Sequence, residues 1–167
     1  RVIQLGETPD RVFNFGAPGL DSIQHLAFEN RLSLEQKLDF QLKSPLFLAT
    51  YHPETLGKKD SLIALNEMLE AFDEFPEATV VFTSSNADNG GRALISCIDQ
   101  WIEKNIHRAK AIVSLGQRIY LSLMRESDLV IGNSSSGIIE IPSLNIPVVN
   151  IGMRQKGRVK SNCIIDV

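Results

Sequence analysis

The chain has little cysteine and no pattern of metal ligands. Cys97 and Cys163 are its only two cysteines, they lie far apart, and neither belongs to a Cys-x-x-Cys pair. The three histidines do not cluster with them. Closely spaced cysteine and histidine pairs are what zinc sites and disulfide scaffolds require, so the sequence predicts neither. We expect a protein of a reducing, cytoplasmic compartment, with no metal and no cofactor.

Long apolar runs and runs of one charge are absent as well. No stretch approaches the roughly 20 consecutive apolar residues of a membrane span, and no signal-peptide pattern is present. The formal net charge is −3 without a Lys/Arg run, which argues against nucleic acid as a partner. The 43% of hydrophobic and 22% of charged residues are typical of a folded globular domain.

Apolar segments typical of strands alternate with segments of helical periodicity. Strands are expected at 11–15, 46–50, 79–83, 111–113, 129–131, 148–150 and 163–165. Helices are expected at 20–30, 59–75, 93–106 and 117–126, with a short one starting at Ser33. Near-continuously apolar strands separated by helices indicate a parallel sheet that is covered on both faces. The predicted fold is α/β, a Rossmann-like, doubly wound parallel sheet.

Ligands of such sheets bind beyond the carboxyl ends of the strands. The residues expected at those ends are His52, Asn86, Asp88, Leu115, the serine cluster 134–136 and the basic segment 152–158. Because the carboxyl ends of parallel strands meet at one edge of a sheet, we expect these loops to form a single rim.

The segment from Ile131 to Glu140 is the most informative. A strand ends there in a cluster of small hydroxyl residues, followed by a glycine and a carboxylate: Ser134, Ser135, Ser136, Gly137 and Glu140. Hydroxyls, backbone N–H groups and a helix N-terminus at one point suit a phosphate. A carboxylate further along can accept hydrogen bonds from a vicinal diol such as a ribose. The alternative is that the serines only cap a helix.

Three other parts of the rim allow two interpretations each. His52, beside a proline, is either a structural loop residue or a group that neutralises a diphosphate and gives it a proton. Arg154 is either a solvated charge or a bidentate phosphate ligand. The loop with Asn86 and Asp88 is either a plain connection or lies beside the sugar and phosphate of a ligand.

Three segments together resemble one enzyme family. They are Asn-Ser-Ser-Ser-Gly-Ile-Ile-Glu at 133–140, Pro-Ser-Leu at 142–144 and Asn-Ile-Gly-Met-Arg-Gln-Lys-Gly-Arg at 150–158. This set resembles the UDP-N-acetylglucosamine 2-epimerases, and its Arg-Gln-x-Gly-Arg part favours the hydrolysing branch. The non-hydrolysing branch usually has Ser-Gly-Gly and a double carboxylate where this chain has Ser135-Ser136 and Ile139-Glu140. The resemblance covers nearly the whole chain.

The resemblance implies one half of a two-domain glycosyltransferase-B architecture with its active site between the domains. Residues 1–19 would be the end of the N-terminal domain and the interdomain linker. Residues 20–167 would be the C-terminal UDP-binding domain, incomplete at its C-terminus. A first residue Arg1 in place of Met agrees with a piece of a longer protein. The expected partners are UDP, a UDP-N-acetylhexosamine and the missing domain, in a homo-oligomer.

The family also implies roles for single residues. Ser134 and Ser135 would hold the diphosphate, Glu140 the ribose hydroxyls, and the backbone at Leu115 would face the uracil. His52 and Arg154 would lie near the leaving diphosphate. Ser136 and Gly137 would complete the nucleotide site.

The implied reaction removes the C2 proton of UDP-N-acetylglucosamine and expels UDP. Water then adds to the 2-acetamidoglucal intermediate to give N-acetylmannosamine. The acids and bases for the proton steps would lie mostly on the missing domain, so this chain alone should be inactive. The alternatives are a hydrolysing epimerase of a UDP-diacetamido-trideoxyhexose, a non-hydrolysing epimerase, a glycosyltransferase donor domain, and a nucleotide-binding module without catalysis.

Overall fold

One parallel sheet forms the centre of the protein. The computed structural model describes residues 1–54, 61–83 and 91–167. Among these residues, six strands lie in the order β3-β2-β1-β4-β5-β6, and every neighbouring pair is parallel. Their bounds are β1 Leu46–Thr50, β2 Thr79–Thr83, β3 Ala109–Ile112, β4 Leu129–Gly132, β5 Val148–Asn150 and β6 Ile164–Asp166. The α/β, Rossmann-like prediction is confirmed.

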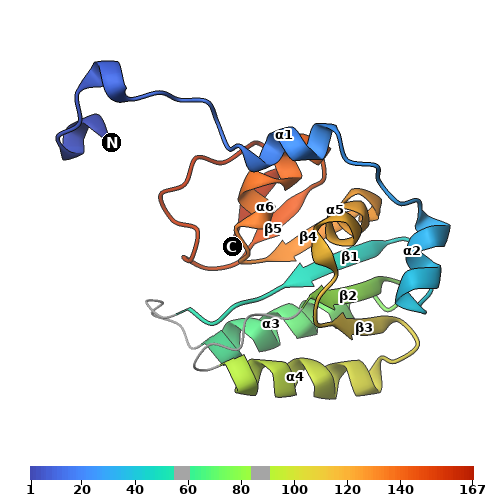
Figure 1. The fold of residues 1–167 in the computed structure, drawn as a ribbon. Helices are drawn as coiled ribbons and strands as arrows, with labels where there is room; N and C mark the ends of the chain where they lie inside the picture. The colour runs from blue at the N-terminus through green and yellow to red at the C-terminus, as the bar shows by residue number, and fades with distance from the viewer. Residues whose placement is uncertain (55–60, 84–90) are drawn as a thin grey trace.

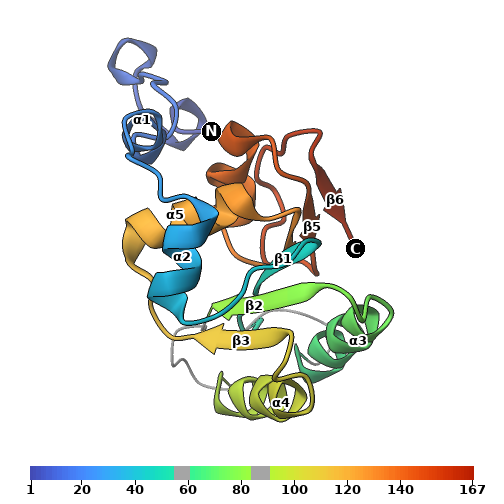
Figure 2. The same cartoon turned by 90° about the vertical axis from the view of Figure 1, so that its right-hand side faces the viewer.

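Helices cover both faces of the sheet (Figures 1 and 2). The α-helices are α1 Gly19–Gln24, α2 Arg31–Leu38, α3 Ser61–Asp73, α4 Gly91–Lys104, α5 Gly116–Glu126 and α6 Ser136–Ile139. Helices α3 and α4 pack on one face, while α1, α2 and α5 pack on the other. The side chains of β1 alternate accordingly, with Phe47 and Ala49 in the first core and Leu46 and Leu48 in the second. This two-sided burial explains the continuous apolar strands in the sequence.

The register places three strand ends side by side. Thr50 of β1 is paired with Gly132 of β4, and Gly132 is paired with Asn150 of β5. The chain goes from β1 outward to β2 and β3, and then returns to the other side of β1 with β4. This is the point at which a doubly wound sheet reverses its strand order, and ligands bind beyond it. The loops after β1, β4 and β5 therefore start from one small area.

The N-terminal segment differs from expectation. The strand expected at 11–15 does not form: Pro9–Arg11 is a short 3-10 helix, as is Ile3–Leu5, and residues 12–18 have no regular structure. Phe13 and Phe15 stack on each other with their ring centroids 5.8 Å apart, and both are exposed. Residues 1–18 form an arm outside the layers of the sheet and its helices (Figure 1). A strand needs a neighbour to receive its backbone hydrogen bonds, and the arm lies beside none.

Several helix and strand boundaries also shift. The helix expected at 20–30 ends at Gln24. The next helix begins at Arg31, not Ser33, because the Asn30 side chain caps it by accepting from the Ser33 N–H at 2.9 Å. Strand β3 starts two residues earlier than expected, and β6 starts one residue later. Within the described residues, no helix has the length and apolar character of a membrane crossing.

The segment after β4 contains only one turn of α-helix. Helix α6 ends at Ile139, and a 3-10 helix, Ile141–Leu144, with Pro142 in its first turn follows. Pro142 has no backbone N–H to donate, which is consistent with the end of the α-helix before it. The expected helix dipole is smaller than the sequence suggested, because four residues align few peptide units.

Candidate functional site

Asn133 joins the loops after β1 and β4. Its side chain is fully buried. The Oδ1 atom accepts from the His52 N–H at 2.7 Å, and the Nδ2 atom donates to the His52 carbonyl at 2.8 Å. The Asn133 N–H donates to the Thr50 carbonyl at 3.1 Å. The Asn133 amide thus replaces a neighbouring strand for His52 and fixes the backbone that carries the imidazole.

Gly132 makes this approach possible. Its φ of 132° is in the region that glycine adopts readily, and a Cβ there would overlap the carbonyl oxygen of Thr50. Strand β4 therefore ends in the one residue type that lets Asn133 turn inward beneath the end of β1.

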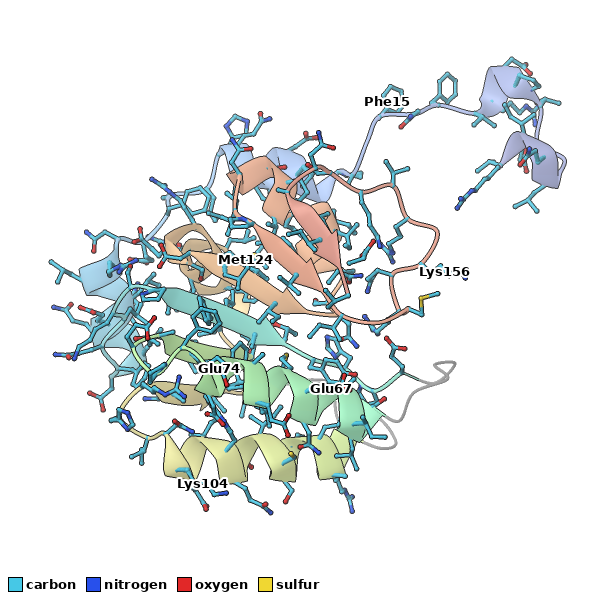
Figure 3. The ribbon with its side chains drawn as sticks, turned by 180° about the vertical axis from the view of Figure 1, so that it is seen from behind. Phe15, Glu67, Glu74, Lys104, Met124 and Lys156 are labelled. Atoms are coloured by element: carbon cyan, nitrogen blue, oxygen red, sulfur yellow. The ribbon has the colours of Figure 1, made fainter. Side chains whose placement is uncertain are left out.

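The loop after β5 is held against the same asparagine. Arg154 Nη1 and Gln155 Nε2 both donate to the Asn133 carbonyl, at 3.1 and 2.8 Å. Gln155 is only 2% exposed, whereas Arg154 is an exposed residue. Figure 3 shows this loop, marked by Lys156, running around the edge of the sheet between β5 and β6. The structure thus brings His52, Arg154 and the start of the serine loop together, as predicted.

The three serines are not fully used in capping. Ser135 is the N-cap of α6, yet its side chain makes no capping hydrogen bond. Ser134 Oγ lies 3.3 Å from Ser136 Oγ and accepts from the Ser136 N–H at 3.4 Å. All three residues are half-buried. Gly137 has a packing role, because a Cβ there would lie 3.2 Å from Val148 Cγ1 of β5. The Ser135 hydroxyl makes no capping bond, and the Ser134 hydroxyl, which donates to Ser136 Oγ, can rotate to donate to an anion instead.

The carboxyl group of Glu140 has an unusual environment. Its Oε2 atom is buried and has no hydrogen-bond partner among the described residues. Burial raises the pKa of its carboxyl above the ordinary value, although its own backbone N–H and the positive charge of Arg158 oppose the rise. A buried carboxylate oxygen without a donor destabilises the fold. Such an oxygen is expected where a ligand supplies the donor.

Two further buried acceptors lack a partner within the described part of the chain. They are Asn150 Oδ1, at the end of β5, and Gln155 Oε1, in the loop after it. The other end of each amide is bound: Asn150 Nδ2 donates to Asp166 at 2.7 Å, and Gln155 Nε2 donates to Asn133. All three orphan acceptors belong to the segment 140–155. Buried acceptors without donors are rare in folded proteins, so their concentration in this segment marks it as a candidate ligand site.

Leu115 belongs to a different part of the rim. It lines a mainly apolar pocket of about 170 Å³ together with Thr83, Gly116 and Tyr120, at the ends of β2 and β3. In the sheet order, β1 lies between β2, at whose end the pocket begins, and β4, which leads into the serine loop. Asn86 and Asp88 lie outside the described residues. No group of three His, Cys, Asp or Glu that could hold a metal occurs among the described ones.

Sequence reasoning assigned no role to three residues that organise the site. Asn133 and Gln155 lie inside the recognised motifs, but their connecting function depends on the register between strands. Glu54 was also missed, although its carboxylate accepts from two N–H groups of the loop after β5, at 3.0 and 3.1 Å. A usable signal existed for Asn133: a polar amide directly after a buried strand that ends in glycine must find buried partners.

Comparison with known proteins identifies the family of the chain. A family model described as UDP-N-acetylglucosamine 2-epimerase matches residues 1–167. The chain belongs to this family. A curated relative from Campylobacter jejuni, GDP/UDP-N,N'-diacetylbacillosamine 2-epimerase (hydrolyzing), is 42% identical over 99% of the chain. The polysialic acid biosynthesis protein P7 of Escherichia coli is 38% identical over the whole chain. The predicted resemblance to this family and its hydrolysing branch is confirmed.

The chain is shorter than these proteins. It spans 43% of the length of the Campylobacter protein and 42% of the Escherichia protein. A solved structure of UDP-GlcNAc 2-epimerase from Neisseria meningitidis, bound to UDP-GlcNAc, has a TM-score of 0.62 and is 20% identical. It covers 89% of this chain, which covers 40% of it. At this identity the likeness shows the fold, which this epimerase family shares.

Proposed function

We propose that this chain is the UDP-binding half of a hydrolysing 2-epimerase that acts on a UDP-linked 2-acetamido sugar. The observation that carries the proposal is Glu140, whose buried Oε2 atom has no donor among the described residues. It follows the serine cluster in a family whose description names a UDP-sugar. A ribose diol would supply the missing donors.

The proposal divides the rim by chemistry. The hydroxyls of Ser134 and Ser135 bind the diphosphate, while Ser136 and Gly137 shape the turn between them and Glu140. Arg154 places a guanidinium beside the Asn133 carbonyl, where its remaining N–H groups can bind phosphate oxygens. The backbone at Leu115, in its apolar pocket, faces the uracil.

The reaction is an elimination followed by hydration. A base removes the proton from C2, the C1–O bond breaks, and the electron pair of that bond leaves with UDP. The sugar becomes a 2-acetamidoglucal with a C1=C2 double bond. Water then adds its hydroxyl at C1. C2 receives a proton on the face opposite to the one from which its proton was removed. His52 neutralises the departing diphosphate or protonates it. The base at C2 belongs to the part of the protein outside this chain.

Two sugars are candidates. UDP-N-acetylglucosamine is the substrate expected from the sequence, with N-acetylmannosamine as product. UDP-N,N'-diacetylbacillosamine, a diacetamido-trideoxyhexose, is favoured by the 42% identity to the Campylobacter enzyme of that name. The two sugars share the uridine diphosphate and the reacting C1–C2 unit, so the residues above serve either substrate.

The remainder of the protein completes the catalyst. The relatives are more than twice as long as this chain, which supports a second domain across the cleft. We propose that residues 1–19 lead from that domain, that the complete protein forms a homo-oligomer, and that this chain alone has no turnover.

The deciding experiment incubates the full-length protein separately with UDP-N-acetylglucosamine and with UDP-N,N'-diacetylbacillosamine. Coupled detection of free UDP and proton NMR of the sugar are the measurements. Release of UDP together with a free sugar of inverted C2 configuration supports the proposal, and the faster substrate identifies the sugar. A product that retains UDP would reveal a non-hydrolysing epimerase. Transfer to an acceptor with C2 unchanged would reveal a glycosyltransferase.

A further inference from the structure

We infer that Glu54 is a positioning residue that holds the loop after β5 so that Arg154 faces the serine loop. This inference deepens the proposed function and rests on it. Glu54 lies two residues after His52, and its Oε1 atom accepts from the N–H groups of Met153 and Arg154 at 3.0 and 3.1 Å. A carboxylate that receives two N–H bonds is among the stronger hydrogen-bonded contacts in proteins.

The turn that receives Glu54 is shaped for it. Gly152 has a φ of 72°, in the left-handed region, and a Cβ at this position would overlap the Glu54 carboxylate. Successive N–H groups in such a turn form a concavity that binds anions. Here the anion is a side chain of the protein itself. The Glu54 N–H donates to Ser61 Oγ at 3.0 Å, which fixes the Glu54 backbone to the start of α3.

The contacts form a closed ring that joins the loops after β1, β4 and β5. Asn133 binds both backbone groups of His52, and the Asn133 carbonyl binds the side chains of Arg154 and Gln155. Glu54, two residues after His52, accepts from the Arg154 N–H and so connects the loop after β1 to the loop after β5. The ring therefore links the proposed leaving-group histidine to the proposed phosphate arginine. We expect the loss of the Glu54 contact to free the backbone of Arg154.

The same geometry shows how Glu54 acts. The negative charge of Glu54 would repel a diphosphate, so Glu54 does not act by binding the ligand directly. The N–H groups of Met153 and Arg154 already have an acceptor and are not available as phosphate donors. What remains is the orientation of the Arg154 side chain. The effect of Glu54 on ligand binding must therefore disappear when the guanidinium is removed.

A double-mutant cycle in the full-length protein tests this coupling. The variants are Glu54→Ala, Arg154→Ala and the double substitution, and the measurement is the dissociation constant of UDP by calorimetry. We expect Glu54→Ala to weaken UDP binding about tenfold, but to change it less than twofold when Arg154 is already alanine. Glu54→Gln, which keeps an acceptor oxygen, should restore most of the affinity. Independent, multiplicative losses in the cycle would overturn the inference.

Hydrogen exchange of the ligand-free protein separates this inference from the proposed function. Glu54→Ala should speed exchange of the Met153 and Arg154 amides at least fivefold. The matched control is Glu74→Ala, an exposed glutamate that Figure 3 places well apart from the loop marked by Lys156; it should change neither exchange nor affinity. If the wild-type protein does not bind UDP, the proposed function fails while exchange still tests the contact. Unchanged exchange in Glu54→Ala refutes the contact itself.

Discussion

Replacement of Glu140 by glutamine should weaken UDP binding, and the loss should come only from the contacts to the ribose hydroxyls. The substitution keeps the size of the side chain and one acceptor oxygen, but it removes the charge of the carboxylate. A hydrogen bond to a charged group contributes about 1.5–3 kcal/mol, which corresponds to roughly 10- to 150-fold in Kd. We expect the loss within this range because Oε2 has no competing partner among the described residues.

The assay compares two ligands with two proteins. UDP and its 2',3'-dideoxy analogue carry the same base and diphosphate, so their affinity ratio isolates the ribose hydroxyls. Calorimetry should give a large ratio for the wild-type protein and a clearly smaller one for Glu140→Gln, whose amide oxygen can still accept a neutral hydrogen bond. If both ligands lose affinity equally in the variant, then Glu140 does not bind the ribose and the assignment is wrong.

The same substitution should have the opposite effect on the stability of the ligand-free protein. The folded-state pKa of Glu140 is raised by burial, so the ionised carboxylate destabilises the fold at pH values above that pKa. The penalty is relieved as pH falls through the folded pKa toward the unfolded value. Glu140→Gln should therefore melt at a higher temperature than the wild type at pH 8, with a gap that narrows as the solution is acidified. A variant that melts lower at pH 8 would contradict the desolvation argument.

Three further predictions test the scaffold and the chemistry. Gly132→Ala should destabilise the protein by about 3 kcal/mol or more, since the new Cβ would overlap the Thr50 carbonyl. The control Gly116→Ala, at a φ of 65° but with open space around the new Cβ, should cost only about 1–2 kcal/mol. Equal urea unfolding curves for the two variants would refute the overlap at Gly132. Asn133→Ala should cost about 3 kcal/mol in urea unfolding, because both backbone groups of His52 lose their partner, and a loss below 1 kcal/mol would contradict this. His52→Gln should lower kcat of the full-length protein about 10²- to 10⁴-fold with little change in UDP affinity, and an unchanged kcat would remove it from the mechanism.

Buried strands were predictable because their pattern is set by burial alone. The segments 46–50, 79–83 and 148–150 form strands at the expected residues. Segment 11–15 has a similar apolar content but forms none, because a strand depends on a neighbour that local sequence does not reveal. The start of α2 shows a similar limit, because a helix was expected from Ser33 but Asn30 caps it and it begins at Arg31. Both residue types cap helices, and the Ser33 hydroxyl instead donates to Glu29 at 2.6 Å.

The rim of the site was predictable for a topological reason. His52, Ser134 and Arg154 come from loops after three strands that the sequence identified, and parallel strands place those loops at one edge. The contacts among the loops could not be predicted. The Asn133 carbonyl becomes a shared acceptor only when Thr50, Gly132 and Asn150 lie in register. That register is set by packing of the whole sheet, which no single motif encodes.

Hydrogen bonding separates the residues of this rim into two groups with different expected behaviour. Asn133 binds other parts of the chain through both ends of its amide and Glu54 through its Oε1 atom, so they form the scaffold. Glu140 has a buried oxygen without a partner among the described residues, at a cost to the fold. Substitution of a scaffold residue should lower stability in the absence of ligand. Substitution of Glu140 should raise it and weaken binding, because a site that destabilises the free protein recovers that free energy only when its ligand supplies the missing donors.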